Sequence, residues 1–177
     1  MIRLEYFEQN DFTQLIEWIH SEELLTNWAG SLFSFPLTQD SMNWYIQKTN
    51  DLQTSDAFVY KVVDVETGET VGHISLGGIS RKNRSGRISR VLIGSAAHKG
   101  KGYCKDMVRA ILKIGFEDLK LHRISLGVYD FNTSALKCYQ SAGFSIDGKM
   151  RDVLAFGDKW WSLIEMSILE DEWQQIK

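Results

Sequence analysis

Apolar residues alternate with polar ones along several short stretches of the chain, which is the period of a strand that is buried on one face. In other stretches apolar residues recur every three or four positions, as on one face of a helix. The alternation predicts strands over residues 2–7, 57–65, 70–79, 85–93, 122–128, 144–153 and 159–167. The helical period predicts helices over residues 12–19, 21–30, 37–49, 103–119 and 133–142, and residues 170–173 read as a tail.

Local end signals support these helices. Asp11, Ser21 and Asn132 each precede a helical stretch and can accept hydrogen bonds from its first N–H groups. Gly30 and Gly143 lie at or just past the end of a helical stretch, where a left-handed residue commonly stops a helix.

The order of the elements predicts the fold. Hairpins precede and follow a strand–helix–strand connection over residues 85–128, and a connection of that length joins parallel strands. We therefore expect a mixed α/β fold with helices on the faces of one central sheet. In sheets of this kind ligands bind beyond the carboxyl ends of the parallel strands.

Composition narrows the class of protein. The chain has 177 residues, one proline (Pro36) and no Gly/Ser-rich linker, which predicts a single domain. A net charge of -3 argues against nucleic-acid or anionic-membrane partners, and the four basic residues within 81–87 are too few to change this. The sequence has no signal-like or membrane-spanning apolar run, so we expect a cytoplasmic protein in which Cys104 and Cys138 are reduced thiols.

The stretch "AHKGKGYCKDM" (residues 97–107) lies at the carboxyl end of a predicted parallel strand and opens a helix. Glycines let a ligand approach the backbone, and the free N–H groups of a helix N-terminus favour a phosphate. Lys99 and Lys101 add positive charge. The stretch predicts either a phosphate site or a solvated basic helix cap.

Two nucleotide motifs do not fit this stretch. A Walker loop needs Ser or Thr after Gly-Lys to hold magnesium, but Gly102 follows Lys101. A dinucleotide fingerprint needs a third glycine where the chain has Lys105, whose side chain is too large for the close packing.

A second motif follows the next strand. Asn132 and Tyr139 are seven residues apart, two turns along one helix face, beside the end of that strand. Asn132 alone could be a helix cap, and Tyr139 alone could be a core residue. Together with the neighbouring phosphate turn, they predict a site for a long phosphorylated ligand between the two parallel strands.

On these residues the chain resembles the GNAT superfamily of acyl-CoA-dependent N-acyltransferases. Residues 91–112, "VLIGSAAHKGKGYCKDMVRAIL", look like its pyrophosphate-binding motif, and "NTSALKCYQSAGF" looks like its Asn-x-x-Ser…Tyr…Gly-Phe motif. Residues 150–173 resemble the subgroup that acetylates the N-terminal amines of ribosomal proteins. The chain departs from the pattern at Lys99, usually Arg or Gln, and at Cys104, usually Gly or Ala.

The resemblance implies a single N-acetyltransferase domain over residues 1–177, with a mostly antiparallel sheet that splays at its parallel pair. It implies acetyl-CoA as the acyl donor, no metal, and direct transfer to an amine. Tyr139 would protonate the leaving thiolate, and Asn132 would hydrogen-bond the pantetheine arm. Backbone groups would pair with that arm at Val91, Leu92 and Ile93, and the pyrophosphate would be held by Lys99, Gly100, Lys101, Gly102, Tyr103 and Cys104.

The phenol is suited to this role because its pKa of about 10 lies just above the value of about 8.5 for a thiol. A covalent acetyl-cysteine at Cys104 is disfavoured, since only His98 on the turn could serve as its base.

The general base and the acceptor are less defined. Residues 85–94 carry no glutamate, which leaves Glu22, Glu23, Asp130 or a water chain as base candidates. A site without a strong base favours an amine of low pKa, such as a peptide N-terminus. A polyamine, an antibiotic or a small metabolite stays open as the acceptor.

Aromatic residues near the predicted acceptor side give further expectations. Trp28 and Glu22 are the expected acceptor contacts, and Trp44 is expected in the core. Trp160 and Trp161 mark a strand edge or the contact of a homodimer. The rival function is a catalytically idle acyl-CoA-binding regulatory domain of the same fold.

Overall fold

The computed structural model describes all residues 1–177, and seven strands form one sheet in the order β1-β2-β3-β4-β5-β7-β6. Only β4 and β5 pair in parallel. The other five pairings are antiparallel, which confirms the expected mixed sheet. The strands are β1 Ile2–Tyr6, β2 Phe58–Asp64, β3 Thr70–Ser80, β4 Ser85–Ile93, β5 Arg123–Tyr129, β6 Ser145–Phe156 and β7 Lys159–Leu169.

Six α-helices accompany the sheet. They are α1 Phe12–Trp18, α2 Glu22–Ala29, α3 Gln39–Tyr45, α4 Tyr103–Lys113, α5 Thr133–Ala142 and α6 Glu170–Ile176. The predicted cap Ser21 accepts a hydrogen bond from the N–H of Leu24. The helix expected over residues 103–119 is α-helical only to Lys113 and continues as a π-helical turn over Ile114–Asp118.

The expected tail at residues 170–173 is instead the start of α6. Three acidic residues in its first turn stabilise the helix, because negative charge is attracted to the positive end of the helix dipole. The side chain of Trp173 is buried in the core and holds the helix in place. The sequence pattern missed this helix because its apolar face is reduced to little more than one tryptophan.

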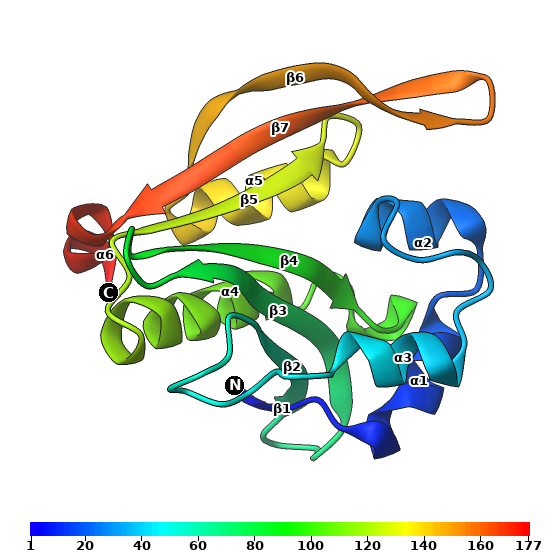
Figure 1. The fold of residues 1–177 in the computed structure, drawn as a ribbon, viewed down its shortest axis with the longest axis horizontal. Coiled ribbons are helices and arrows are strands. Elements are labelled where there is room, and N and C mark those ends of the chain that lie inside the picture. The colour runs from blue at the N-terminus through cyan, green and yellow to red at the C-terminus, as the bar shows by residue number, and fades with distance from the viewer.

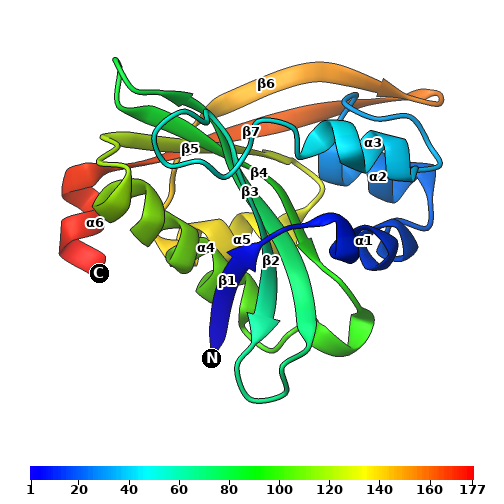
Figure 2. The same ribbon diagram turned by 60° about the horizontal axis from the view of Figure 1, so that its bottom comes forward.

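The helices cover the two faces of the sheet (Figures 1 and 2). Side chains alternate along β2, so that Phe58 and Tyr60 join the core under α4 and α5, which we call the α4–α5 core. Val59 between them joins the core under α1, α2 and α3, the α1–α3 core. Both views place α1, α2 and α3 together at one end of the molecule and α6 at the opposite end.

The sheet opens between β4 and β5. Their parallel pairing covers only three positions of each strand and ends at Arg87 and Ser125, after which the strands diverge (Figure 1). The guanidinium of Arg87 forms an ion pair with Glu165 of β7 across this last rung. We call the opening between residues 88–91 and 126–129 the β4–β5 gap, and it confirms the expected splay.

Two expectations from the sequence are wrong. Cys104 and Cys138 are not reduced thiols but form a disulfide, because α4 and α5 pack side by side and bring their Cα atoms to 6.3 Å. Trp44 is not a core residue: its side chain lies at the rim of the α1–α3 core, where 56% of its surface is exposed. None of the helices is both long enough and apolar enough to cross a membrane.

Candidate functional site

A glycine loop joins β4 to α4 through a 3₁₀ turn over Ala96–His98. Gly100 and Gly102 have φ angles of 79° and 83°, a region that side-chain-bearing residues rarely adopt. A Cβ atom added at either position would meet no atom within 4 Å. The two glycines are therefore needed for the turn itself, and the space above the loop is open to a ligand.

The loop leaves the N-terminus of α4 without a side-chain cap, because its N-cap residue is Gly102. The first N–H groups of the helix thus stay available to an anion. Lys99 and Lys101 are exposed and form no ion pair within the protein. These features fit the predicted pyrophosphate site.

Tyr103 anchors the loop rather than offering its side chain to a ligand. Its hydroxyl donates a hydrogen bond to Asp64 at the end of β2. This bond raises the pKa of Tyr103 to about 12. The side chain of Cys104 is likewise engaged in the disulfide, so both residues can contact a phosphate only through their backbone N–H groups.

A small cavity of about 50 Å³ lies in the β4–β5 gap, and its lining residues include Val91 of β4 and Tyr139 of α5. Leu92 and Ile93 pair with His73 and Gly72 of β3, while the pairing of β4 with β5 ended at Arg87. The edge of β4 that faces the gap is therefore free to bind an extended ligand. The predicted residues Val91, Leu92 and Ile93 all lie along this edge.

Tyr139 occupies the gap as expected. Its side chain is 6% exposed and makes no hydrogen bond within the protein. Burial raises the pKa of its phenol, so the hydroxyl stays protonated at neutral pH. The ring packs against Phe144 with centroids 6.3 Å apart.

Asn132 serves as the N-cap of α5. Its side-chain oxygen accepts hydrogen bonds from the N–H of Ala135 at 3.2 Å and from the hydroxyl of Ser134 at 3.3 Å. The cap uses the oxygen and leaves the two N–H groups of the amide free. The capping role read from the sequence is confirmed, and the contact to a pantetheine arm stays a prediction.

The two expected acceptor contacts lie in different surroundings. Trp28 lines the cavity in the gap, and its indole N–H donates to the carbonyl oxygen of Arg90 at 2.9 Å. Glu22 is exposed in the first turn of α2 and lines neither this cavity nor the next. Asp130, a base candidate, is engaged in an ion pair with Lys149 at 2.7 Å.

A larger open cavity of about 750 Å³ lies between α2 and the tip of the β6–β7 hairpin. Its charged residues are Glu23 from α2 and Asp158 and Lys159 from the hairpin. The other walls are mostly aromatic: Phe131, Phe156, Trp160 and Trp161. Phe131 stacks on Tyr129 at 5.8 Å, and Tyr129 also lines the gap cavity, so one aromatic row connects the two. We call this the aromatic cavity.

The sequence did not single out Phe131 or Phe156 for this cavity. The two residues are 25 positions apart, and each packs against Trp161 of β7. They come together only because β7 pairs with both β5 and β6. No local spacing could have joined them.

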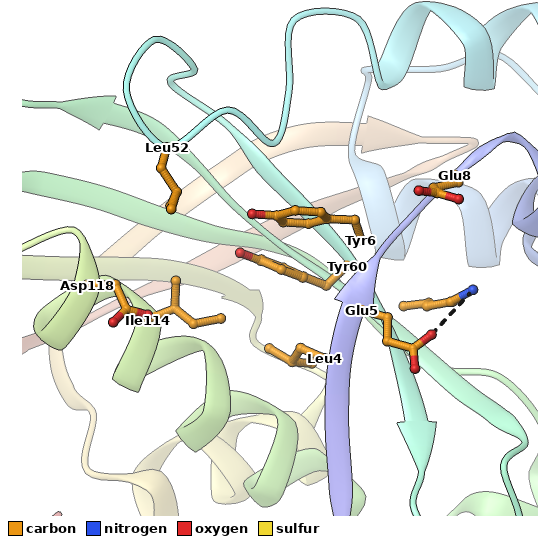
Figure 3. Close-up of a pocket in the computed structure, with 9 residues that line it drawn as sticks. Leu4, Glu5, Tyr6, Glu8, Leu52, Tyr60, Ile114 and Asp118 are labelled. Carbon is orange, nitrogen blue, oxygen red and sulfur yellow. Dashed lines mark ion pairs between the residues drawn. The ribbon is translucent and has the colours of Figure 1, made fainter.

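A further open cavity lies away from the gap, at β1, β2 and the end of α4 (Figure 3). Tyr6 and Tyr60 stack there at 5.3 Å, and Lys61 pairs with Glu5 and Asp11. None of the residues predicted to bind donor or acceptor lines it. No group of three or more His, Cys, Asp and Glu side chains is placed to hold a metal ion.

Comparison with known proteins bears on the same site. The model of the family described as "Acetyltransferase (GNAT) domain" matches residues 2–145. The chain is 28% identical to the probable N-acetyltransferase YjcK of Bacillus subtilis over 127 residues, which cover 70% of this chain and 68% of that protein. It is also 28% identical to the putative ribosomal N-acetyltransferase YdaF of the same organism over 107 residues, covering 60% of this chain and 57% of YdaF.

The fold is that of a solved spermidine N-acetyltransferase. The structure of the Vibrio cholerae enzyme in complex with CoA and spermine superposes with a TM-score of 0.83 and covers 98% of each chain, at 21% identity.

Proposed function

Since the chain belongs to the acetyltransferase (GNAT) family, we propose that it transfers acetyl from acetyl-CoA directly to a primary amine, with Tyr139 as the general acid. The observation that carries this proposal is the position of Tyr139. Its phenol is buried and without a hydrogen-bond partner in a gap between parallel strands, and the uncapped N-terminus of α4 follows one of those strands.

In the proposed binding mode, the pyrophosphate of acetyl-CoA lies on the loop from Lys99 to Cys104. The pantetheine arm pairs with the free edge of β4, and the N–H groups of the Asn132 amide bind the arm from α5. The pairing of β4 with β5 supports this placement of the arm, because it ends at Arg87 and leaves the backbone groups beyond it without a partner strand on that side.

The chemistry follows from this placement. The amine nitrogen attacks the thioester carbon, the C–S bond breaks, and the departing thiolate takes the proton of Tyr139. The acylated nitrogen then gives up its second proton, which returns to the Tyr139 phenolate and leaves a neutral amide. Because burial raises the pKa of this phenol, it holds its proton until the thiolate forms. The residues that line the gap cavity include no carboxylate, so the proton of the acceptor ammonium leaves through water.

The acceptor we propose is a cationic primary amine, at a peptide or protein N-terminus or on a small molecule. The aromatic cavity supports this class because aromatic faces attract organic cations, and its two carboxylates, Glu23 and Asp158, outnumber its one basic residue, Lys159. The absence of a carboxylate in the gap favours an amine of low pKa within this class. A homodimer and a cytoplasmic location stay predictions.

The test is a panel of primary amines and peptides incubated with acetyl-CoA, read by release of the CoA thiol and by a mass shift of one acetyl group on the amine. We expect at least one member to be acetylated catalytically. Tight binding of acetyl-CoA with no acetylation of any member would support the idle regulatory domain instead.

A further inference from the structure

Arg90 occupies an irregular point of β4 that directly borders the gap. The register of β3 and β4 moves from Ser75 opposite Ser89 to His73 opposite Leu92, so β4 carries one extra residue there. Arg90 has a φ of 53°, in the left-handed region that residues with a Cβ avoid. This conformation needs contacts that hold it.

Two aromatic side chains hold the Arg90 carbonyl group. Its oxygen accepts hydrogen bonds from the indole N–H of Trp28 and from Nδ1 of His73, each at 2.9 Å. Trp28 comes from α2 and His73 from β3, and their rings pack together on the α1–α3 side of the sheet. The carbonyl is therefore turned out of the sheet toward α2.

The tautomer of His73 follows from this contact. A carbonyl oxygen can only accept, so Nδ1 must carry the proton and Nε2 is left with a lone pair. Nε2 is buried and has no partner. Burial lowers the pKa of His73 to about 4, so the ring is neutral at pH 7 and is too weak and too enclosed to be the missing base.

The side chain of Arg90 also contacts the protein and helps to fix this residue. Its Nε donates to the hydroxyl of Tyr45 at 3.0 Å, and its guanidinium lies 5.1 Å from the centre of that ring. The sequence left Arg90 unexplained because its partners are 17 to 62 positions away along the chain.

Trp28, Arg90 and Tyr139 line the same gap cavity. We propose that Trp28 and His73 are positioning residues of the acetyl transfer, which hold the Arg90 carbonyl away from the thioester. Negative charge grows on the thioester oxygen as the amine attacks, and a backbone carbonyl that faced it would repel that charge. The inference rests on the proposed function, because it places the thioester beside Tyr139.

The test compares variants that remove one donor each. Trp28→Phe keeps an aromatic ring against Phe33 and removes the indole N–H. His73→Leu removes the ring donor, while His73→Asn keeps an amide N–H close to the position of Nδ1. Trp44→Phe is the matched control, since the exposed Trp44 makes no hydrogen bond through its indole.

We expect kcat to fall about tenfold or more in Trp28→Phe and His73→Leu, with the Kd of CoA unchanged, because CoA lacks the acetyl carbonyl. His73→Asn should retain most of the wild-type kcat, and Trp44→Phe all of it. The inference is overturned if Trp28→Phe keeps the wild-type kcat, or if His73→Asn loses as much kcat as His73→Leu. In either case the proposed function stands as long as the unmutated protein turns over. No turnover by the wild-type protein with any amine would reject both.

Discussion

Burial shifts the pKa values of two residues beside the β4–β5 gap in opposite directions, because it disfavours the charged form of each. The charged form of Tyr139 is the phenolate, so its pKa rises and the hydroxyl keeps its proton. The charged form of His73 is the imidazolium, so its pKa falls to about 4 and the ring stays neutral. One physical cause therefore keeps the proton on the proposed general acid and keeps neutral the ring that holds the Arg90 carbonyl.

The buried histidine predicts a pH dependence of stability. The pKa of His73 falls from 6.5 in the unfolded chain to about 4 in the folded protein, so the unfolded chain binds its proton first as the pH is lowered. The contribution of the neutral ring is complete above pH 6.5 and is lost progressively toward pH 4. We expect this residue to lower the free energy of unfolding by about 3 kcal/mol across that window.

His73→Asn is the reference for this measurement, because asparagine does not titrate. Urea unfolding of both proteins between pH 7 and pH 4 isolates the histidine from the carboxylates, which titrate in both. Parallel curves for the two proteins would contradict a buried neutral His73.

At the scale of elements, the disulfide joins the start of α4 to the middle of α5 and closes a loop with a sequence separation of 34. A cross-link of that span restricts the unfolded chain and stabilises the fold by roughly 3 to 4 kcal/mol in the chain-entropy account. We expect dithiothreitol to lower the free energy of unfolding by that amount. In the double variant Cys104→Ala and Cys138→Ala the reductant should have no effect on the free energy of unfolding. If dithiothreitol also left the wild-type protein unchanged, the Cys104–Cys138 disulfide would be contradicted.

The glycine loop gives a second prediction at this scale. Replacing both Lys99 and Lys101 with alanine should raise KM for acetyl-CoA roughly tenfold at low salt and leave kcat unchanged, because the two charges would contact only the pyrophosphate. The increase should shrink as salt is added. Lys113→Ala, at the exposed far end of α4, is the control. Equal KM values for this control and the double variant would show that Lys99 and Lys101 do not bind the acetyl donor.

The sequence predicts those features of the helices and strands that depend on residues close together along the chain. The cap at Ser21 is local chemistry, and the parallel pairing of β4 with β5 follows from the length of the connection between them. The disulfide and the contacts of His73 depend on how distant elements pack, so no spacing along the chain could indicate them. Trp44 was expected in the core because hydrophobicity does not say which side of a short helix meets the rest of the protein.

At the scale of the whole molecule, the sheet separates the two cores and the gap opens between them. Two elements far apart in the sequence, α2 and the tip of the β6–β7 hairpin, lie on the same side of the molecule (Figure 1). Residues of both line the aromatic cavity. The α4 N-terminus supplies the proposed donor site on one side of the gap, and the aromatic cavity supplies the proposed acceptor site. Tyr129 and Tyr139 lie between the two in the gap cavity.

The variant Tyr139→Phe tests whether Tyr139 protonates the leaving thiolate, as proposed. The variant removes only the hydroxyl and keeps the ring that packs against Phe144. Tyr60→Phe is the matched control, since Tyr60 is also a buried phenol of raised pKa but lies in the cavity away from the gap (Figure 3).

The measurement is kcat with the best amine of the panel, together with the Kd of acetyl-CoA, for the wild-type protein and both variants. We expect Tyr139→Phe to lose at least about a hundredfold in kcat, with the Kd of acetyl-CoA unchanged. Tyr60→Phe should keep wild-type values of both. A wild-type kcat in Tyr139→Phe would show that Tyr139 is not the general acid.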